Sequence, residues 1–473
     1  MNSESLNQGR YQVELASTDM LVPKGHLLRL IDEHIDFSFV TVKTKPYYTK
    51  TLGRPPIPPI RLFKMMLIGY LYGIRSERQL EMEINLNVAY RWFLGLGMTE
   101  RVPDHSTISL NRNERFAGSD VFQEIFDELV HLAISHRMVA GRVLFTDATH
   151  IRADANNNKY DMQVVPETPR AYLKELEEAV QQDRVLNGKQ PLPPGKENEE
   201  AGPRKTSRTD PESGYMMRIG KPEGFHYLEH RTVDHKMGII TDVYVTSGTV
   251  NEPVVYVERL QRQIDTFGFT ALEAVALDSS YMTPYVCKKT TEMGLFAAIA
   301  PRKRPSTKGM LAKADFTYDS KQNVYHCPQG QILAYSTTTR DGHRLYVSDP
   351  TQCAICPIVN QCTSNKEMKR SVYRHIWEEF RDGVQANANR AIGQMLLRWR
   401  QQKIEPSFGE AKVLHQYRRC KFRGRAKTQE QALLTAFVQN LKKIVRRLAA
   451  KAKQETQGYS MLILRLLFAP VIR

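Results

Sequence analysis

Two short apolar runs that each end on an aspartate constrain the fold of this chain most strongly. Residues 143–147 are Val-Leu-Phe-Thr-Asp, and residues 271–278 are Ala-Leu-Glu-Ala-Val-Ala-Leu-Asp. Runs of this kind predict buried β-strands, and active sites of open α/β sheets lie at the carboxyl ends of such strands. We therefore expect Asp147 and Asp278 to lie together at one edge of a sheet. Either aspartate alone could equally be a turn residue or a helix cap.

The segments around these runs predict a mixed α/β layer. Residues 149–155 are expected to form the hairpin partner of the first strand, and residues 168–184 a helix. Further strands are predicted at 226–233, 238–247 and 295–300, with a helix at 254–266. This alternation favours a sheet with helices packed on it over an all-helical or sandwich domain.

The chain before residue 139 is expected to be helical. Apolar residues recur at three- and four-residue steps after the Pro-rich break at 54–59, namely Leu62, Met65, Met66, Tyr70 and Ile74. We therefore predict a helical domain at 1–138 and an α/β core at 139–302 with a flexible insertion at about 185–214. A cysteine-bearing insertion at 303–372, the second part of the core at 373–450 and a tail at 451–473 follow.

The composition favours a polyanionic partner. The net charge is +16 and the isoelectric point about 9.4, which suits nucleic acid first and an anionic membrane surface second. No secretory signal opens the chain, no apolar run is long enough to span a membrane, and six cysteines in 473 residues do not suggest a disulfide scaffold. We expect a cytoplasmic protein that does not bind membranes.

Phosphodiester chemistry by two metal ions needs carboxylates that converge on Mg²⁺ or Mn²⁺. The third carboxylate is expected from a late helix, where Glu405 lies two helical turns before Lys412 on the same face. Lys412 could hold a phosphate beside the metals. The alternative is a solvated Glu–Lys surface pair.

Four stretches resemble the DDE transposases of bacterial insertion sequences, most closely the insertion-sequence family numbered eleven eighty-two. They are residues 67–80 with 90–96 and 103–109, residues 146–153, residues 277–281, and residues 403–412. In the last stretch, the six residues between Glu405 and Lys412 fit the family's spacing. The chain departs from the family at Gln401, where an Arg is expected, and Arg398 or Arg400 could substitute.

The resemblance implies an RNase-H-like catalytic core with an N-terminal all-helical DNA-binding domain. It implies that Asp147, Asp278 and Glu405 hold Mg²⁺ or Mn²⁺, with Glu410 and Asp154 as rival ligands. It further implies binding to the terminal repeats of a mobile element, hydrolysis at its ends, and attack of the freed 3′-hydroxyl on target DNA. We expect a homodimer on double-stranded DNA, associated with the bacterial nucleoid.

Four cysteines suggest a structural zinc site. They are Cys327, Cys353, Cys356 and Cys362, with His326 as a substitute ligand. Thiolates at such spacing in a cytosolic protein favour a tetrahedral zinc site that would fix a loop-rich insertion. Four reduced cysteines without metal are the alternative.

A basic stretch follows the predicted glutamate helix, with aromatic residues between the charges. We expect it to contact DNA phosphates through Lys412, Arg418, Arg419, Lys421, Arg423 and Arg425. A solvated basic loop is the alternative.

Two other functions stay open at this point. One is a catalytically inactive DNA-binding protein derived from a transposase, which the presence of all three carboxylates disfavours. The other is a stand-alone RNase-H-like nuclease, for which the helical N-terminal domain and the basic C-terminal helices are unnecessary.

Overall fold

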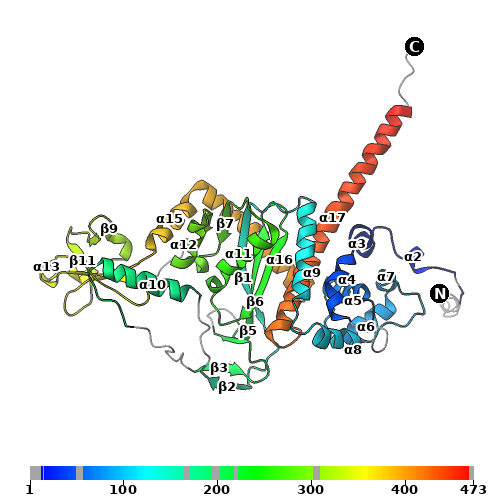
Figure 1. Cartoon of the computed structure of the whole chain (residues 1–473), viewed down its shortest axis with the longest axis horizontal. Helices are drawn as coiled ribbons and strands as arrows, with labels where there is room; N and C mark the ends of the chain where they lie inside the picture. The colour runs from blue at the N-terminus through cyan, green and yellow to red at the C-terminus, as the bar shows by residue number, and fades with distance from the viewer. Residues whose placement is uncertain are drawn as a thin grey trace, which may run out of the picture.

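The computed structural model describes residues 12–13, 15–48, 57–164, 171–193, 203–217, 222–301 and 309–467. Within them lie an N-terminal group of helices, a six-stranded α/β sheet and a separate five-stranded sheet (Figure 1). Residues 54–56 of the predicted Pro-rich break are outside the described part.

The N-terminal region is helical, as predicted. Its helices begin at local sequence signals: Ser76, Asn87 and Asp104 each accept a backbone N–H through their side chains. All five residues of the predicted apolar stripe are buried. The helices are α2 (Thr18–Leu21), α3 (Leu27–His34), α4 (Ser38–Thr44), η1 (Lys45–Tyr47), α5 (Pro59–Leu71), α6 (Glu77–Leu86), α7 (Val88–Phe93), α8 (His105–Leu110), the π-helix η2 (Asn111–Arg115) and α9 (Val121–Ser135).

The central sheet has the strand order of an RNase-H-like core. Its order is β6-β5-β1-β7-β8, with β4 on the same edge of β5 as β6. β5 runs antiparallel to β1, whereas β7 and β8 run parallel to it. The strands are β1 (Val143–Arg152), β4 (Gly214–Met216), β5 (Gly224–Asp234), β6 (Ile240–Ser247), β7 (Ala274–Leu277) and β8 (Phe296–Ile299).

One strand differs from its prediction. β1 does not end at Asp147 but continues to Arg152, so residues 149–155 are not a hairpin partner. The partner is β5, which pairs with the whole of β1 from Leu144↔Asp234 to Arg152↔His226. Because β5 is long enough to pair with the polar half of β1, the strand extends beyond its apolar run.

Helices cover both faces of the sheet. Phe145, Ala276 and Ala298 contact Leu396 of α16 on one face, while the alternate residues belong to the main core on the other. The fully buried Arg231 of β5 donates to the carbonyl of Ser407 in α16 and to Gln439 in α17. The helices are η3 (Glu252–Val254), α11 (Tyr256–Phe267), η4 (Ser279–Tyr281), α12 (Pro284–Glu292), α15 (Glu378–Asn389), α16 (Ala391–Leu414) and α17 (Arg425–Leu467).

Helix α17 links the N-terminal helices to the sheet. It contacts α3, α5 and α9 as well as β6, and the rings of Phe63 and Phe437 meet edge to face with centroids 5.3 Å apart. Helix α17 therefore packs on both the sheet and the N-terminal helices. The helix continues to Leu467, into the predicted C-terminal tail, and projects away from the body (Figure 1).

The cysteine-bearing insertion is a five-stranded antiparallel sheet of order β13-β12-β11-β10-β9, at the opposite end of the molecule from the N-terminal helices (Figure 1). A small aromatic core holds it together. Its elements are η5 (Lys313–Asp315), β9 (Thr317–Asp319), β10 (Val324–His326), β11 (Ile332–Thr338), β12 (His343–Ser348), α13 (Pro350–Ala354), α14 (Val359–Cys362) and β13 (Ser371–His375).

The helix predicted at 168–184 is present as α10 (Ala171–Leu186), which reaches the cysteine-bearing sheet, where Arg344 pairs with Asp183. The segment predicted as a flexible insertion, at about 185–214, is partly regular. β3 (Arg204–Ser207) pairs with β2 (Tyr160–Gln163) as a two-stranded sheet. Residues 194–202 lie outside the described part. None of the helices described is both long and apolar enough to span a membrane.

Candidate active site

Two aspartates meet on the central sheet. Thr146 of β1 is the register partner of Leu277 in the parallel strand β7, so the next residues, Asp147 and Asp278, lie side by side. Asp278 directly follows β7, whereas Asp147 lies in the middle of β1. Their side chains are 19% and 42% exposed. The predicted convergence of these two aspartates is observed.

A third carboxylate, which the sequence analysis did not predict, completes this cluster. One oxygen each from Asp147, Glu252 and Asp278 lies within 4.8 Å of the others. Glu252 opens η3, five residues after the end of β6, and accepts a hydrogen bond from the Ser280 hydroxyl beside Asp278. Since β6 runs parallel to β1, strand-end reasoning applied to β6 would have indicated this glutamate.

Arg400 of α16 contacts the two aspartates. Its Nη1 donates to an Asp147 carboxylate oxygen at 2.8 Å, and its Nη2 lies 3.6 Å from Asp278. Leu396 lies one helical turn earlier and packs on Phe145, so successive turns of α16 follow one face of β1. Burial raises the pKa of Asp147, although Arg400 and the Ala148 N–H oppose the shift.

Glu405 is exposed on α16 and is not a member of the 4.8 Å cluster. It shares a helix face with Lys412, seven residues later. The Lys412 ammonium donates to the Thr149 hydroxyl at 2.6 Å, and Thr149 faces the same side of β1 as Asp147. The Lys412 side chain therefore reaches the strand that carries Asp147, whereas Glu405 lies on the exposed side of the helix.

The two rival ligands are engaged elsewhere. Glu410 accepts hydrogen bonds from Gln439 and Lys442 of α17. Burial favours the neutral carboxyl, but these bonds and one from His415 hold the pKa of Glu410 below its usual range. Asp154 lies beyond the end of β1, where it pairs with Arg419 and Arg423.

The basic stretch lies beside the far end of β1. The N–H of Arg152 donates to the Arg418 carbonyl, and the N–H of Cys420 donates back to the Arg152 carbonyl. This pairing places the exposed Arg418 and Arg419 beside the end of β1, and Arg423 pairs with Asp154 just beyond it. Arg425, also exposed, begins α17 and lies 3.3 Å from the Tyr244 hydroxyl of β6.

Lys421 differs from the other basic residues of this stretch. Its ammonium donates to the Ile74 carbonyl at 2.9 Å and lies 4.4 Å from the centre of the Tyr70 ring. Burial lowers the pKa of Lys421 to about 8. These contacts tie the basic stretch to the N-terminal helices, so Lys421 is placed for packing rather than for a DNA phosphate.

A pocket of about 860 Å³ opens beside the carboxylates. Its lining includes Glu252, Ser279, Ser280, Tyr285 and Trp377. This volume lies in the range of small-molecule sites, so the carboxylates adjoin a space large enough for part of a substrate.

The four cysteines of the insertion line one small pocket. All are free thiols, but their sulfurs do not form a group of three within 4.8 Å. Cys327 accepts a hydrogen bond from the Gln331 N–H at 3.3 Å, and the Cys353 thiol donates to Ser348 at 3.2 Å. The fold of the insertion gathers the four thiols around one pocket, but their sulfurs are not close enough together to form a tetrahedral metal site.

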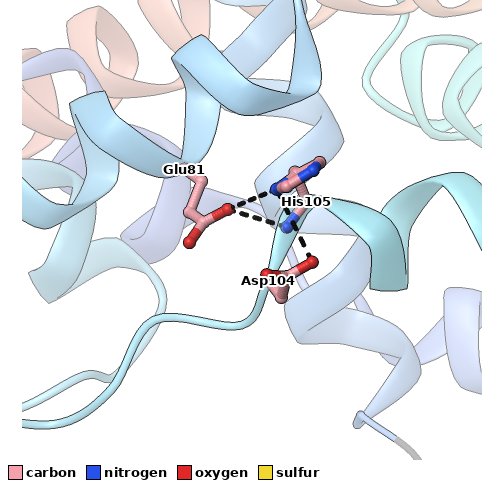
Figure 2. Close-up of side chains that lie close together, drawn as sticks. All are labelled: Glu81, Asp104 and His105. Atoms are coloured by element: carbon pink, nitrogen blue, oxygen red, sulfur yellow. Dashed lines mark hydrogen bonds and ion pairs between the residues drawn. The ribbon is translucent and has the colours of Figure 1, made fainter.

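A second group of potential ligands lies in the N-terminal helices (Figure 2). Asp104 caps α8 by accepting the Ser106 N–H at 2.7 Å. Glu81 of α6 accepts both the backbone N–H of His105 at 2.9 Å and a hydrogen bond from its Nδ1 at 2.8 Å. These bonds join α6 to the start of α8, so the group has a structural role without a metal.

Two parts of the chain match models of transposase families. Residues 16–114 match the model "Transposase domain (DUF772)", and residues 326–445 match "Transposase DDE domain". The second match includes Glu405 and the four cysteines but neither aspartate. No curated protein sequence matches the chain.

Several solved transposase structures are similar at low identity. The piggyBac transposase synaptic complex with hairpin DNA shares 12% identity over 94% of this chain and 82% of that chain, with a TM-score of 0.33. The Mos1 strand transfer complex shares 12% over 76% and 79%, with a TM-score of 0.17. The RNase-H-like arrangement is given by the strand order of this chain's own sheet. Residues 16–114 and 326–445 are thus similar to two transposase domain families, the second of them a DDE domain family.

Proposed function

We propose that this chain is a DNA transposase that cuts DNA at the ends of an insertion sequence and transfers the freed strand to target DNA. The observation that carries the proposal is the cluster of Asp147, Glu252 and Asp278 on a sheet of RNase-H-like order. The resemblance of residues 146–153, 277–281 and 403–412 supports assignment to the insertion-sequence family numbered eleven eighty-two.

The cluster fits divalent metal ions. All three side chains offer carboxylate oxygens, the hard ligands that Mg²⁺ and Mn²⁺ prefer. Their oxygens lie within 4.8 Å of one another, and two oxygens on one Mg²⁺ lie up to about 4 Å apart. Bound ions would activate the attacking oxygen and stabilise the leaving one.

We propose Glu405 as a further ligand that joins the site when DNA is bound. Its helix already approaches β1 through the bond between Lys412 and Thr149. Lys412 is then well placed to hold a phosphate of the strand being cut. A glutamate that is exposed on a long helix can turn to a metal at little cost, because no described contact has to be broken.

The DNA is proposed to run along the exposed arginines beside β1, with its end near the 860 Å³ pocket. Arg418, Arg419, Arg423 and Arg425 contribute phosphate contacts. We propose a homodimer on the paired element ends and a bacterial, nucleoid-associated location, both from the family resemblance.

A zinc ion is proposed for the cysteine-bearing sheet. The four thiols line one pocket, and four thiolates are a common structural zinc set. Binding requires the Cys353 thiol to leave Ser348 and the four sulfurs to move closer to one another.

The test uses the full chain and duplexes with the terminal repeats that flank its coding sequence. Asp147→Ala and Asp278→Ala should keep DNA binding, because Lys and Arg contacts dominate affinity, and should lose cleavage and strand transfer. A wild-type protein that binds these ends without cutting them would support the inactive DNA-binding alternative. Cutting without strand transfer would support the nuclease. Cleavage by Asp147→Ala at the normal rate would refute the site.

A further inference from the structure

The guanidinium of Arg400 occupies the space between the two aspartates. It lies 2.8 Å from Asp147 and 3.6 Å from Asp278, and the side chain is only 7% exposed. Its Nε is buried and makes no hydrogen bond to any described residue. The contacts of its two Nη atoms with the aspartate carboxylates therefore determine where this guanidinium lies.

A divalent cation would need the same oxygens. A metal ligand and a hydrogen-bond acceptor use the same carboxylate lone pairs, and two cationic groups this close repel each other. Three carboxylates with one arginine leave a net charge of about −2 when all are ionised. The arginine thus neutralises part of the charge that draws a metal to the site.

We infer that Arg400 is an internal counter-ion that competes with divalent metal for Asp147 and Asp278 and withdraws when metal binds. This inference rests on the proposed metal-dependent function. It assigns Arg400 a positioning role, since the residue acts through the carboxylates. The alternative role, in which Arg400 orients the carboxylates for metal, predicts the opposite effect on metal affinity.

The test measures Mn²⁺ binding to the full chain without DNA, by electron paramagnetic resonance and by calorimetry. Arg400→Gln should bind Mn²⁺ roughly 10- to 100-fold more tightly, the factor expected for removing hydrogen bonds to charged groups. Arg398→Gln, an exposed arginine on the same helix, should change affinity little and controls for lost charge. Arg400→Lys keeps the charge without the two-pronged geometry and should fall between.

Thermal unfolding supplies a second measurement. Without metal, Arg400→Gln should melt at a lower temperature than the wild type, because three carboxylates lose their counter-ion. Added Mg²⁺ should raise the melting temperature more in Arg400→Gln than in the wild type, since tighter binding stabilises more. If Arg400→Gln does not fold, Arg400→Lys must still bind Mn²⁺ more tightly than the wild type.

Two failures are distinguishable. If wild type and Arg400→Gln both bind Mn²⁺ in a way that Asp278→Asn removes, but Arg400→Gln binds equally or more weakly, Arg400 is not a competitor and the proposed function stands. If neither protein binds Mn²⁺ at a site that Asp278→Asn removes, the metal-dependent function itself is wrong.

Discussion

Replacing Glu252 decides whether the third metal ligand comes from η3, as the cluster indicates, or only from α16. Glu252→Gln keeps an oxygen that can accept the Ser280 hydrogen bond but removes one charge from a group spanning 4.8 Å. Two unit charges 4 Å apart interact by about 4 kcal/mol at an effective dielectric constant of 20. This equals nearly three powers of ten, so we expect metal affinity to fall by roughly 100- to 1,000-fold.

The assay is the Mn²⁺ dependence of cleavage of a terminal-repeat duplex, measured beside Mn²⁺ binding without DNA. For Glu252→Gln, half-maximal cleavage should need far more metal, and binding without DNA should weaken. Glu258→Gln, an exposed glutamate of α11, is the matched control and should behave as the wild type. Glu405→Gln should leave metal binding without DNA nearly unchanged and reduce cleavage. A Glu252→Gln protein with wild-type metal dependence would show that proximity in the cluster does not make Glu252 a ligand.

Three further predictions address the basic stretch, the cysteines and a buried acid. Replacing the exposed Arg418, Arg419 and Arg423 together should weaken binding to all DNA sequences. The dependence of the binding constant on salt concentration, measured in titrations at several salt concentrations, should fall in slope by roughly one unit per lost phosphate contact. Metal analysis should find about one zinc per chain, reduced in Cys353→Ser; a zinc-free, folded wild type would exclude the site. Burial raises the pKa of Glu430 to about 8. The contribution of this carboxyl to the free energy of unfolding is therefore full below about pH 4.5 and is lost as the pH rises through 8. In urea unfolding between pH 6 and 9, Glu430→Gln should show a smaller fall in the free energy of unfolding than the wild type.

Local sequence patterns are sufficient to predict most of the helices and strands and the central pair of aspartates. Apolar runs specify buried strands at β1 and β7 because those side chains must leave water, and each run ends at the residue that carries the carboxylate. Ser76, Asn87 and Asp104 specify helix starts through bonds to nearby backbone N–H groups. These signals act over a few residues, so they can be recognised in the sequence without knowledge of the fold.

The contacts between groups that are distant in the chain depend on the assembled fold. Glu252 joins the cluster because β6 runs parallel to β1 in the assembled sheet, and Arg400 reaches it because α16 lies along β1. β1 continues to Arg152 because β5 pairs with its polar half, and Lys421 packs inward because the Ile74 carbonyl lies beside it. In each case the deciding contact joins residues far apart in the chain, and its energy depends on a geometry that no local pattern encodes.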